Sequence, residues 1–336
     1  MVNDSSHAVQ ENKEMDSILV YQELIEKRIN ELDLPDKPSN LYDPLRYFLS
    51  LGGKRTRPTL TLLGCQLFGT PGVKALNAAL AVELFHNFTL IHDDIMDKAP
   101  LRRGKQTVHT KWDENIGILS GDVLFVEAYK RLSKHEVDVL PALLKVFSKT
   151  AVEVCEGQQL DMDFEERDDV KIDEYIEMIR LKTSVLIGAA LEMGAIIAKA
   201  SEEDTQKIYN FGENVGIAFQ LQDDILDLYA DSDKFGKQIG GDIKSNKKTF
   251  LLIKAFEMAS DKQKDALNTM LSMTDLDKKV VVAHQLFEEL GVKEQAKAKM
   301  DEFYNLAKKN MDEISVSEQA KKNLLKLGSY LMNREL

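Results

Sequence analysis

Residues 83–104 have the sequence ELFHNFTLIHDDIMDKAPLRRG, an apolar helical pattern that ends in an acidic motif and two arginines. On a helix, Asp93 and Asp97 lie on one face, about 6 Å apart along the axis. Two such carboxylates repel each other unless a cation lies between them, and Mg²⁺ prefers oxygen ligands of this kind. Arg102 and Arg103 follow, and guanidinium groups bind phosphate oxygens through paired hydrogen bonds. The segment therefore predicts a metal site that binds a diphosphate.

A second acidic motif lies in residues 219–227, FQLQDDILD, where Asp223, Asp224 and Asp227 repeat the DDxxD spacing of the first motif. A single acidic motif on a helix is more often a solvated face than a metal site. Both motifs, however, follow apolar stretches, FTLI and VGIAF, so their carboxylates are expected to face inward. Inward-facing carboxylates must be paired or metal-bound. The repetition therefore favours two metal-binding motifs over two solvated faces.

The composition indicates one large helical domain. The chain has 336 residues and only 7 prolines, and no Pro/Gly/Ser-rich linker divides it. Its 43% hydrophobic and 30% charged residues are sufficient for a sizeable core. We therefore expect residues 1–336 to form a single all-α domain with no strand, in which residues 1–14 are frayed.

The charge and the cysteines exclude other classes of protein. A net charge of −12 argues against a nucleic-acid partner. Cys65 and Cys155 lack metal-ligand spacing and are expected to be reduced thiols in the core. The N-terminus has no signal or transit pattern, and the longest near-apolar run, residues 184–198, is too short to span a bilayer. We expect a cytoplasmic protein without stable membrane insertion.

Three further segments carry cations that are candidates for phosphate binding. GGKRTRP, residues 52–58, places Lys54, Arg55 and Arg57 at a helix start, where the helix dipole favours anions. Lys182 interrupts an apolar helix, so it must reach an anion or extend to solvent. A Gly- and Lys-rich loop after the second motif is expected to be a phosphate lid, and its lysines are Lys237, Lys244, Lys247 and Lys248.

Apolar periodicity predicts helices along almost the whole chain. The expected helices start near Met15, near Asn115 and at several further points, and the main ones cover residues 72–98, 119–132, 137–161, 172–199, 204–229 and 250–336. His86 precedes Asp93 by two turns and is expected on the face of the carboxylates. His92 is expected to be structural.

Six segments, in their order along the chain, resemble the trans-isoprenyl diphosphate synthases, or polyprenyl synthetases. They are GGKRTRP, DDIMD with LRRG, EGQQLD, LKTS, FQLQDDILD and GGDIKSNKKT, and they cover nearly the whole chain. The resemblance implies a single antiparallel helical bundle of the isoprenoid synthase type around a central cavity, with the two aspartate motifs facing each other across its mouth. It also implies a homodimer.

The resemblance also implies roles for individual residues. Asp93, Asp97 and Asp223 look like ligands of about three Mg²⁺ ions per site, with Asp94 and Asp227 in support. The implied contacts of the allylic diphosphate are Arg102, Lys182, Thr183, Gln220, Lys237 and Lys247. The implied contacts of isopentenyl diphosphate are Lys54, Arg57, His86, Arg103 and Phe219. The implied catalytic residues are Asp93, Asp97, Arg102, Lys182, Asp223 and Lys247.

The implied reaction is a Mg²⁺-dependent 1′–4 condensation of isopentenyl diphosphate with an allylic diphosphate, which gives an all-trans prenyl diphosphate. Departure of the allylic diphosphate leaves a carbocation, so the catalyst must stabilise the leaving oxygens, and no nucleophilic side chain is required. Water must be excluded because it would quench the cation. A class I terpene cyclase is disfavoured, since its second metal motif mixes Asn, Ser and Glu, whereas here the second motif is DDILD.

Phe88 and Thr89 are the residues expected to set product length. They precede Asp93 by five and four residues, where a bulky side chain forms a floor in the family. One aromatic residue followed by a small one resembles enzymes that make geranylgeranyl diphosphate (C20). Farnesyl diphosphate (C15) is the alternative product, and C25 remains open. The alternative function is that of a partner subunit of a prenyl synthase, which has no activity of its own.

Overall fold

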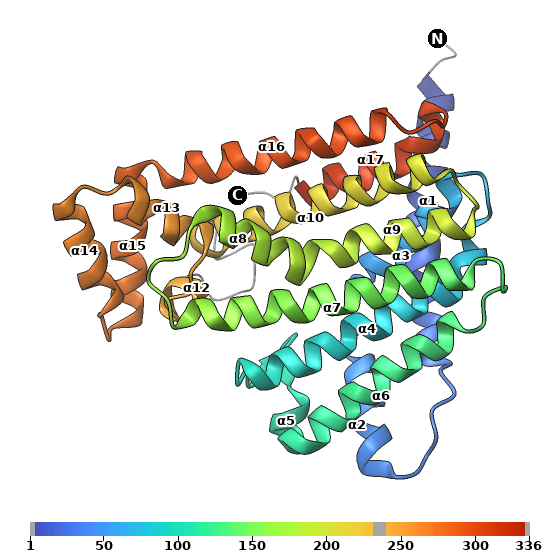
Figure 1. Cartoon of the computed structure of the whole chain (residues 1–336), viewed down its shortest axis with the longest axis horizontal. Helices are drawn as coiled ribbons and strands as arrows, with labels where there is room; N and C mark the ends of the chain where they lie inside the picture. Colours follow the sequence, from blue (N-terminus) through green and yellow to red (C-terminus); the bar gives the residue numbers. More distant parts are fainter. Residues whose placement is uncertain (1–3, 231–239, 333–336) are drawn as a thin grey trace. The chain divides into compact units, whose positions relative to one another are not determined.

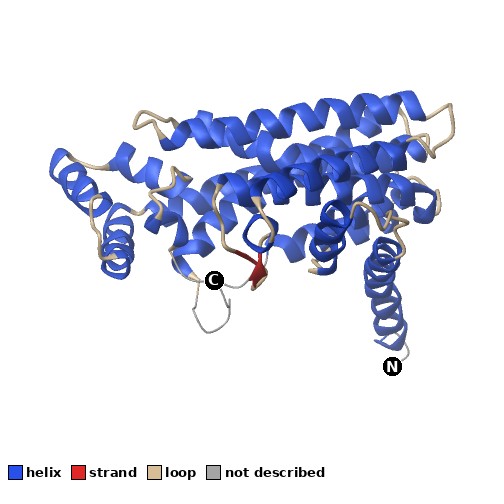
Figure 2. Cartoon of the chain, turned by 90° about the horizontal axis from the view of Figure 1, so that it is seen from below, coloured by secondary structure: helices blue, strands red, loops and turns tan. Residues whose placement is uncertain are grey.

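The computed structural model describes residues 4–230 and 240–332, and of residues 4–16 the backbone alone. The described chain is helical apart from one hairpin of two-residue strands, as Figure 2 shows. The predicted all-α class is therefore confirmed. The chain divides into two compact units, and each is described below by itself.

Unit 1 comprises Met1–Phe147, Ala190–Thr205 and Val316–Asn323. Its own helices are α1 (Asp4–Asn30), α2 (Ser39–Ser50), α3 (Thr56–Leu67), the 3₁₀ turn η1 (Gly72–Ala75), α4 (Leu76–Met96), α5 (Val108–Lys111) and α6 (Glu114–Leu132). α4 packs against α3 and α6, which Figure 1 shows beside it, and most of its side chains are buried. This central helix carries the first acidic motif at its C-terminal end.

A hairpin follows α4, although the sequence pattern predicted no strand. Its strands are β1 (Leu101–Arg102) and β2 (Lys105–Gln106), and they pair antiparallel. Arg103 and Gly104 form the turn, and both have positive φ angles, of 53° and 73°. Positive φ at both central positions is the geometry that closes a two-residue hairpin. The prediction missed these strands because they are too short to produce an alternating pattern.

Unit 2 comprises Ser148–Ala189, Gln206–Ser315 and Leu324–Leu336. Its own helices are α8 (Ile172–Ile179), the π turn η2 (Arg180–Ser184), α12 (Gly241–Lys244), α13 (Phe250–Met258), α14 (Asp261–Leu271), α15 (Leu276–Leu290) and α16 (Val292–Asp312). Four helices have residues in both units: α7 (Leu140–Glu165), α9 (Val185–Ile197), α10 (Glu202–Tyr229) and α17 (Glu318–Met332). α10 carries the second acidic motif, and its apolar residues belong to a buried core in this unit.

Three expectations about the helices and cysteines were wrong in detail. The first helix begins at Asp4 and not near Met15. The helix expected over residues 172–199 is interrupted by the π turn η2. Cys65 is buried as expected, but Cys155 is exposed, because it lies on the outer side of α7. The single-domain organisation of residues 1–336 and the fraying of residues 1–14 stay predictions.

None of the helices in the described part of the chain has the length and apolar character needed to span a membrane.

Candidate active-site clusters

The first acidic motif lies at the C-terminal end of α4. Asp97 caps the helix, and its N–H donates to the carbonyl of Asp93 at 2.8 Å, so the two residues keep helical spacing. Asp97 is exposed, and the side chain of Asp93 is 22% exposed. Asp94, in contrast, is buried. The two predicted metal ligands of this motif are therefore the carboxylates that a ligand can reach.

Arg102 neutralises the buried carboxylate. Its Nε donates to both oxygens of Asp94 at 2.9 Å, and its Nη2 lies 2.8 Å from Asp94 Oδ1. The same Nη2 is 3.6 Å from Asp93 Oδ2. Burial raises the pKa of Asp94, while the Arg102 guanidinium opposes this shift. The supporting role expected of Asp94 thus has a physical basis, because Asp94 positions the guanidinium beside Asp93.

Arg55 does not belong with the phosphate-binding residues, which corrects the grouping made from the sequence. It is buried in the loop before α3, with a positive φ of 48°. Its guanidinium donates to Glu26 at 2.7 Å, to Glu83 at 2.6 Å and to the carbonyl of Leu49 at 3.1 Å. A guanidinium with these partners is a structural anchor for the loop, and the helix-start pattern alone could not separate it from its neighbours.

Three predicted contacts of isopentenyl diphosphate come together in unit 1. Arg57 Nη1 lies 3.3 Å from His86 Nε2. Burial lowers the pKa of His86 well below its ordinary value, and the charges of Arg57 and Arg103 lower it further, so this ring is neutral. Gly53 has a φ of 150°, and a Cβ there would lie 2.9 Å from Arg103 Nη2, so the glycine lets the loop pass against that guanidinium. Lys54 is exposed in the same loop.

The second acidic motif has a buried centre in unit 2. Asp224 accepts hydrogen bonds from the Tyr175 hydroxyl, from the Phe250 N–H at 3.3 Å and from Gln220 Nε2 at 3.5 Å. Burial and the nearby charge of Asp242 raise the pKa of Asp224 to about 7. Asp223 and Asp227 are half-buried on the same helix. Gln220, which is predicted to contact the allylic diphosphate, therefore also donates a hydrogen bond to the buried carboxylate of the motif.

Two carboxylates in unit 2 were given no site role from the sequence, although Asp161 was expected to face inward. Asp161 Oδ2 accepts from Lys182 Nζ at 2.6 Å and lies 3.5 Å from Lys247 Nζ. Burial alone would raise the pKa of Asp161, but the two lysines hold it below its ordinary value. Asp242 donates its N–H to Asp227 Oδ2 at 3.1 Å, and burial together with Asp227 raises its pKa to about 6. Asp161 lies in the segment EGQQLD and Asp242 in GGDIK, and these two motifs were the sequence signal that could have identified them.

Lys182 reaches Asp161 from a distorted turn. It lies in the π turn η2, and a Cβ on Gly157 of α7 would be 2.2 Å from the Lys182 backbone nitrogen. The glycine therefore allows the wide turn to approach α7, which also carries Asp161. π turns are often found at functional sites. Thr183 lies in the same turn.

The remaining predicted contacts lie in several places. Phe219 is half-buried on α10, and Thr89 on α4 donates its hydroxyl to the His86 carbonyl at 2.8 Å. Lys244 belongs to the segment predicted to be a lid, and its Nζ lies 3.1 Å from Asp277 Oδ1. Lys237 lies outside the described residues, so its expected contact and the lid itself stay predictions.

The donor groups fit Mg²⁺. In the cluster around the second motif the carboxylates outnumber the ammonium groups of Lys182 and Lys247, and burial, followed by the charge of neighbouring carboxylates, raises the pKa values of Asp224 and Asp242. A divalent cation would relieve this excess of negative charge, and all the donors are oxygen atoms. Within residues 4–230 and 240–332, no three His, Cys, Asp or Glu side chains form a metal site by themselves. The ligand set Asp93, Asp97 and Asp223 stays a prediction.

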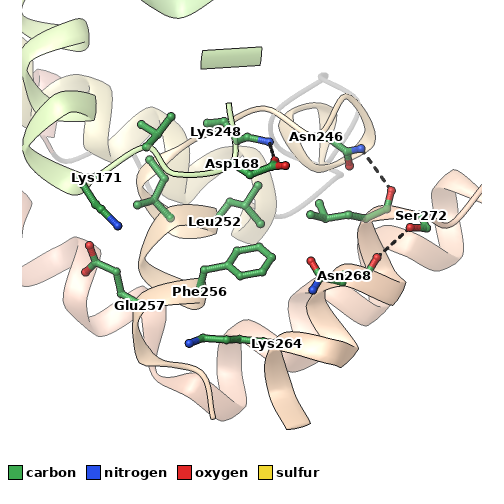
Figure 3. Close-up of a pocket in the computed structure, with 13 residues that line it drawn as sticks. Asp168, Lys171, Asn246, Lys248, Leu252, Phe256, Glu257, Lys264, Asn268 and Ser272 are labelled. Atoms are coloured by element: carbon green, nitrogen blue, oxygen red, sulfur yellow. Dashed lines mark hydrogen bonds and ion pairs between the residues drawn. The ribbon is translucent and has the colours of Figure 1, made fainter. Parts of the chain in front are cut away.

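A separate cavity of about 630 Å³ opens in unit 2 between the start of α8, α13 and α14, as shown in Figure 3. Its apolar lining includes Leu252 and Phe256. Acidic and basic side chains share the rim, and Lys248 Nζ lies 3.2 Å from Asp168 Oδ1. Lys248, a lysine of the expected phosphate lid, lines the cavity, but none of the residues predicted to contact the allylic or isopentenyl diphosphate does. Because the residues assigned to the two diphosphates lie elsewhere, the cavity is not assigned to a substrate.

Comparisons with known proteins identify the family and the fold. The polyprenyl synthetase family model matches residues 38–290. The short chain isoprenyl diphosphate synthase of Methanothermobacter thermautotrophicus is 38% identical over 322 residues, which are 96% of this chain and 98% of the relative. The geranylfarnesyl diphosphate synthase of Natronomonas pharaonis is 35% identical over 335 residues, 93% of this chain and 95% of the relative. A crystal structure of a geranylgeranyl pyrophosphate synthase has 45% identity and a TM-score of 0.89, covering 96% of this chain and 99% of that one.

Proposed function

This chain belongs to the polyprenyl synthetase family, and we propose that it makes geranylgeranyl diphosphate from isopentenyl diphosphate and allylic diphosphates with Mg²⁺. As a member of the family it is a prenyltransferase of the short-chain isoprenyl diphosphate synthases. The observation that carries the proposal is the presence of two carboxylate clusters, each with cationic side chains bound to it: Arg102 on the first motif, and Lys182 with Lys247 beside the second.

The allylic diphosphate is assigned to the residues around the two aspartate motifs. Asp93, Asp97 and Asp223 would hold Mg²⁺, about three ions per site, which neutralises charge on the leaving diphosphate when bound. Lys182 and Lys247 share the carboxylate of Asp161, so both ammonium groups are placed together before substrate arrives. Preorganised cations of this kind stabilise the charge that develops on the leaving oxygens.

Isopentenyl diphosphate is assigned to Lys54, Arg57, His86 and Arg103. The neutral His86 ring lies within hydrogen-bonding distance of Arg57, and it can orient the guanidinium without adding charge. Arg103 is held against the Gly53 backbone. The two guanidinium groups converge from different segments, which is the arrangement needed to hold a diphosphate while its double bond attacks the allylic cation.

Product length is assigned to Phe88, followed by Thr89, one turn before the first motif. Phe88 is half-buried, so part of its ring is available to contact a growing chain. An aromatic ring stops elongation by occupying the space that the next isoprene unit needs. This supports C20 over longer products. Farnesyl diphosphate (C15) is the second candidate, because a single bulky ring before the first motif can also stop elongation one unit earlier.

We also propose a cytoplasmic homodimer. Support for the dimer comes from Leu119 and Val126, which lie two turns apart on α6 and have exposed fractions of 57% and 58%. Contiguous exposed apolar patches mark association surfaces, and these two side chains would form part of one. Sedimentation of Leu119→Glu should show monomers if the face is the interface.

Product analysis tests the proposed function. Purified protein is incubated with isopentenyl diphosphate and a dimethylallyl, geranyl or farnesyl primer, with Mg²⁺ or with EDTA, and the dephosphorylated lipids are separated by chain length. We expect C20 with all three primers and no product in EDTA. The double variant Asp93→Ala, Asp223→Ala should be inactive. Absence of turnover with every primer would favour the partner-subunit alternative.

Phe88→Ala tests the length assignment directly. We expect products longer than C20, because the ring that occupies the path is removed. A Thr89→Ser variant, which keeps a small hydroxyl side chain, serves as the control and should retain C20. An unchanged product of Phe88→Ala would refute the floor.

A further inference from the structure

α4 and α6 of unit 1 pack along one line of contacts that starts at the first acidic motif (Figure 1). Two glycines of α6 lie at that end. A Cβ on Gly117 would be 2.8 Å from Ile95 Cδ1, and a Cβ on Gly121 would be 2.4 Å from His92 Nε2. The missing side chains let the two helices approach closely. His92 Nε2 also lies 3.0 Å from the carbonyl of Ile118, so this ring is a structural contact.

The next step along the same line brings two aromatic rings together. Phe125 follows Gly121 by four residues, and Phe88 precedes His92 by four, so each is one helical turn further from the motif. Their rings are stacked, with centroids 5.0 Å apart and an angle of 11° between the planes. One turn beyond the glycines, the two helices are therefore still close enough for Phe125 to stack face to face on Phe88.

Other rings hold Phe125 in place. Its ring centroid lies 5.5 Å from that of Phe85, 5.4 Å from that of Tyr129 and 6.4 Å from that of Phe147. Phe85 and Phe147 are almost completely buried. Phe125 itself is half-buried, and these ring contacts limit the positions that its ring can take. A ring held on one side of Phe88 restricts the rotamers that Phe88 can adopt.

Phe125 is distinguished from the other neighbours of Phe88. Within the described residues, the rings that contact Phe88 belong to Phe85, His92 and Phe125. The first two are on α4 itself, so they move with Phe88. Only the third comes from a different helix and stacks face to face. Among the ring contacts, it is therefore the one that ties Phe88 to a second helix of unit 1.

We propose that Phe125 is a second determinant of product length, and that it acts by holding the Phe88 ring where it stops the growing chain. This inference rests on the proposed function of Phe88. When the Phe125 ring is removed, Phe88 can turn into the vacated volume, and the path that it blocked opens to a further isoprene unit. Phe125 is thus a positioning residue for chain length, with no role in binding either diphosphate.

The test compares Phe125→Ala, Phe125→Leu, Phe88→Ala and the double variant by chain-length analysis of products from a farnesyl primer. We expect Phe125→Ala to shift product from C20 to C25, and Phe125→Leu, which keeps bulk but loses the flat ring, to shift it less. The double variant should match Phe88→Ala, because Phe125 acts through Phe88. KM for isopentenyl diphosphate should stay unchanged in Phe125→Leu.

Two controls separate positioning from loss of stability. Tyr129→Phe keeps the ring beside Phe125 and should retain C20. Phe287→Leu removes a fully buried ring of unit 2 and should lower stability without changing product length. If Phe125→Ala and Phe125→Leu give wild-type products while Phe88→Ala gives longer ones, the inference about Phe125 is overturned. The proposed role of Phe88 then still stands. A double variant whose products exceed those of Phe88→Ala also overturns the inference about Phe125, because Phe125 would then line the path itself. Unchanged products from Phe88→Ala overturn the proposed floor.

Discussion

At the scale of single residues, the charges in this protein are distinguished by what neutralises them. Arg55 is enclosed by Glu26 and Glu83, whereas Arg57 and Arg103 converge beside a neutral histidine. Lys182 and Lys247 meet at one carboxylate, Asp161. The enclosed cation Arg55 stabilises the fold, whereas the cations gathered around the two acidic motifs are the ones proposed to bind diphosphate.

Arg55→Met is expected to destabilise the fold by about 3–5 kcal/mol, because it leaves Glu83 buried without its partner. Denaturant unfolding measures this change. Arg28→Met removes an exposed ion pair with Glu31 and should cost less than about 1 kcal/mol. Equal effects of the two variants would contradict the anchoring role.

Asp161→Asn is expected to lower kcat/KM for the allylic substrate by about ten- to hundredfold, since charge-assisted hydrogen bonds to Lys182 and Lys247 are lost. KM for isopentenyl diphosphate should not change. Steady-state kinetics with each substrate varied in turn provides the measurement. The matched control is Asp163→Asn, an exposed aspartate on the same helix; if it gives the same loss, Asp161 has no special role.

At the scale of elements, close helix contacts depend on glycine at defined positions. The π turn Arg180–Ser184 lies against Gly157 of α7, and it is this contact that brings Lys182 to Asp161. The helix α10 positions its aspartates differently: Asp224 faces the core and Asp223 and Asp227 are half-buried. One helix thereby supplies a structural carboxylate and two accessible ones.

Gly157→Ala should destabilise the protein by about 1–3 kcal/mol and raise KM for the allylic substrate, because its Cβ would lie 2.2 Å from the Lys182 nitrogen. Thermal unfolding and kinetics test both effects. Gly328→Ala is the matched control, since its Cβ would meet Phe211 at an ordinary 3.7 Å and alanine favours a helix. An unchanged thermal midpoint for Gly157→Ala would show that the turn can move away at little cost.

At the scale of the whole molecule, two carboxylates of unit 2 should lower stability as pH rises when no metal is bound. The pKa of Asp224 is raised to about 7, and that of Asp242 to about 6, well above 3.8. Between pH 4 and pH 7 the folded state therefore binds protons that the unfolded state has released. Each group thus favours folding at low pH and loses this contribution as pH rises.

The lowered pKa of His86 acts in the opposite direction, so the contribution of Asp224 is measured against a variant. Between pH 5 and pH 8 the thermal midpoint of the metal-free wild type should fall more, or rise less, than that of Asp224→Asn. Asparagine keeps an acceptor for Tyr175 but cannot ionise. Calorimetry in EDTA at several pH values provides the test, with the exposed Asp301→Asn as control. Mg²⁺ should raise the midpoint more at pH 8, because metal ligands must be deprotonated. An equal pH difference in wild type and Asp224→Asn would exclude this group as the cause.

The sequence by itself determined the all-α class, both acidic motifs and the family, because helical periodicity and short motifs are local properties of the chain. It could place Asp93 and Asp97 one turn apart for the same reason. It did not anticipate the two-residue strands, since they depend on the turn at Arg103 and Gly104 and carry no pattern of their own.

Only the tertiary structure decided which charges are enclosed and which rings touch. Arg55 and Glu83 lie far apart in the sequence, as do Lys182 and Asp161 or Phe88 and Phe125. Their contacts arise from helix packing, and burial then changes the pKa values and the freedom of the side chains. The spacing of residues along one helix cannot predict these contacts and pKa shifts, because each depends on a partner residue from another part of the chain.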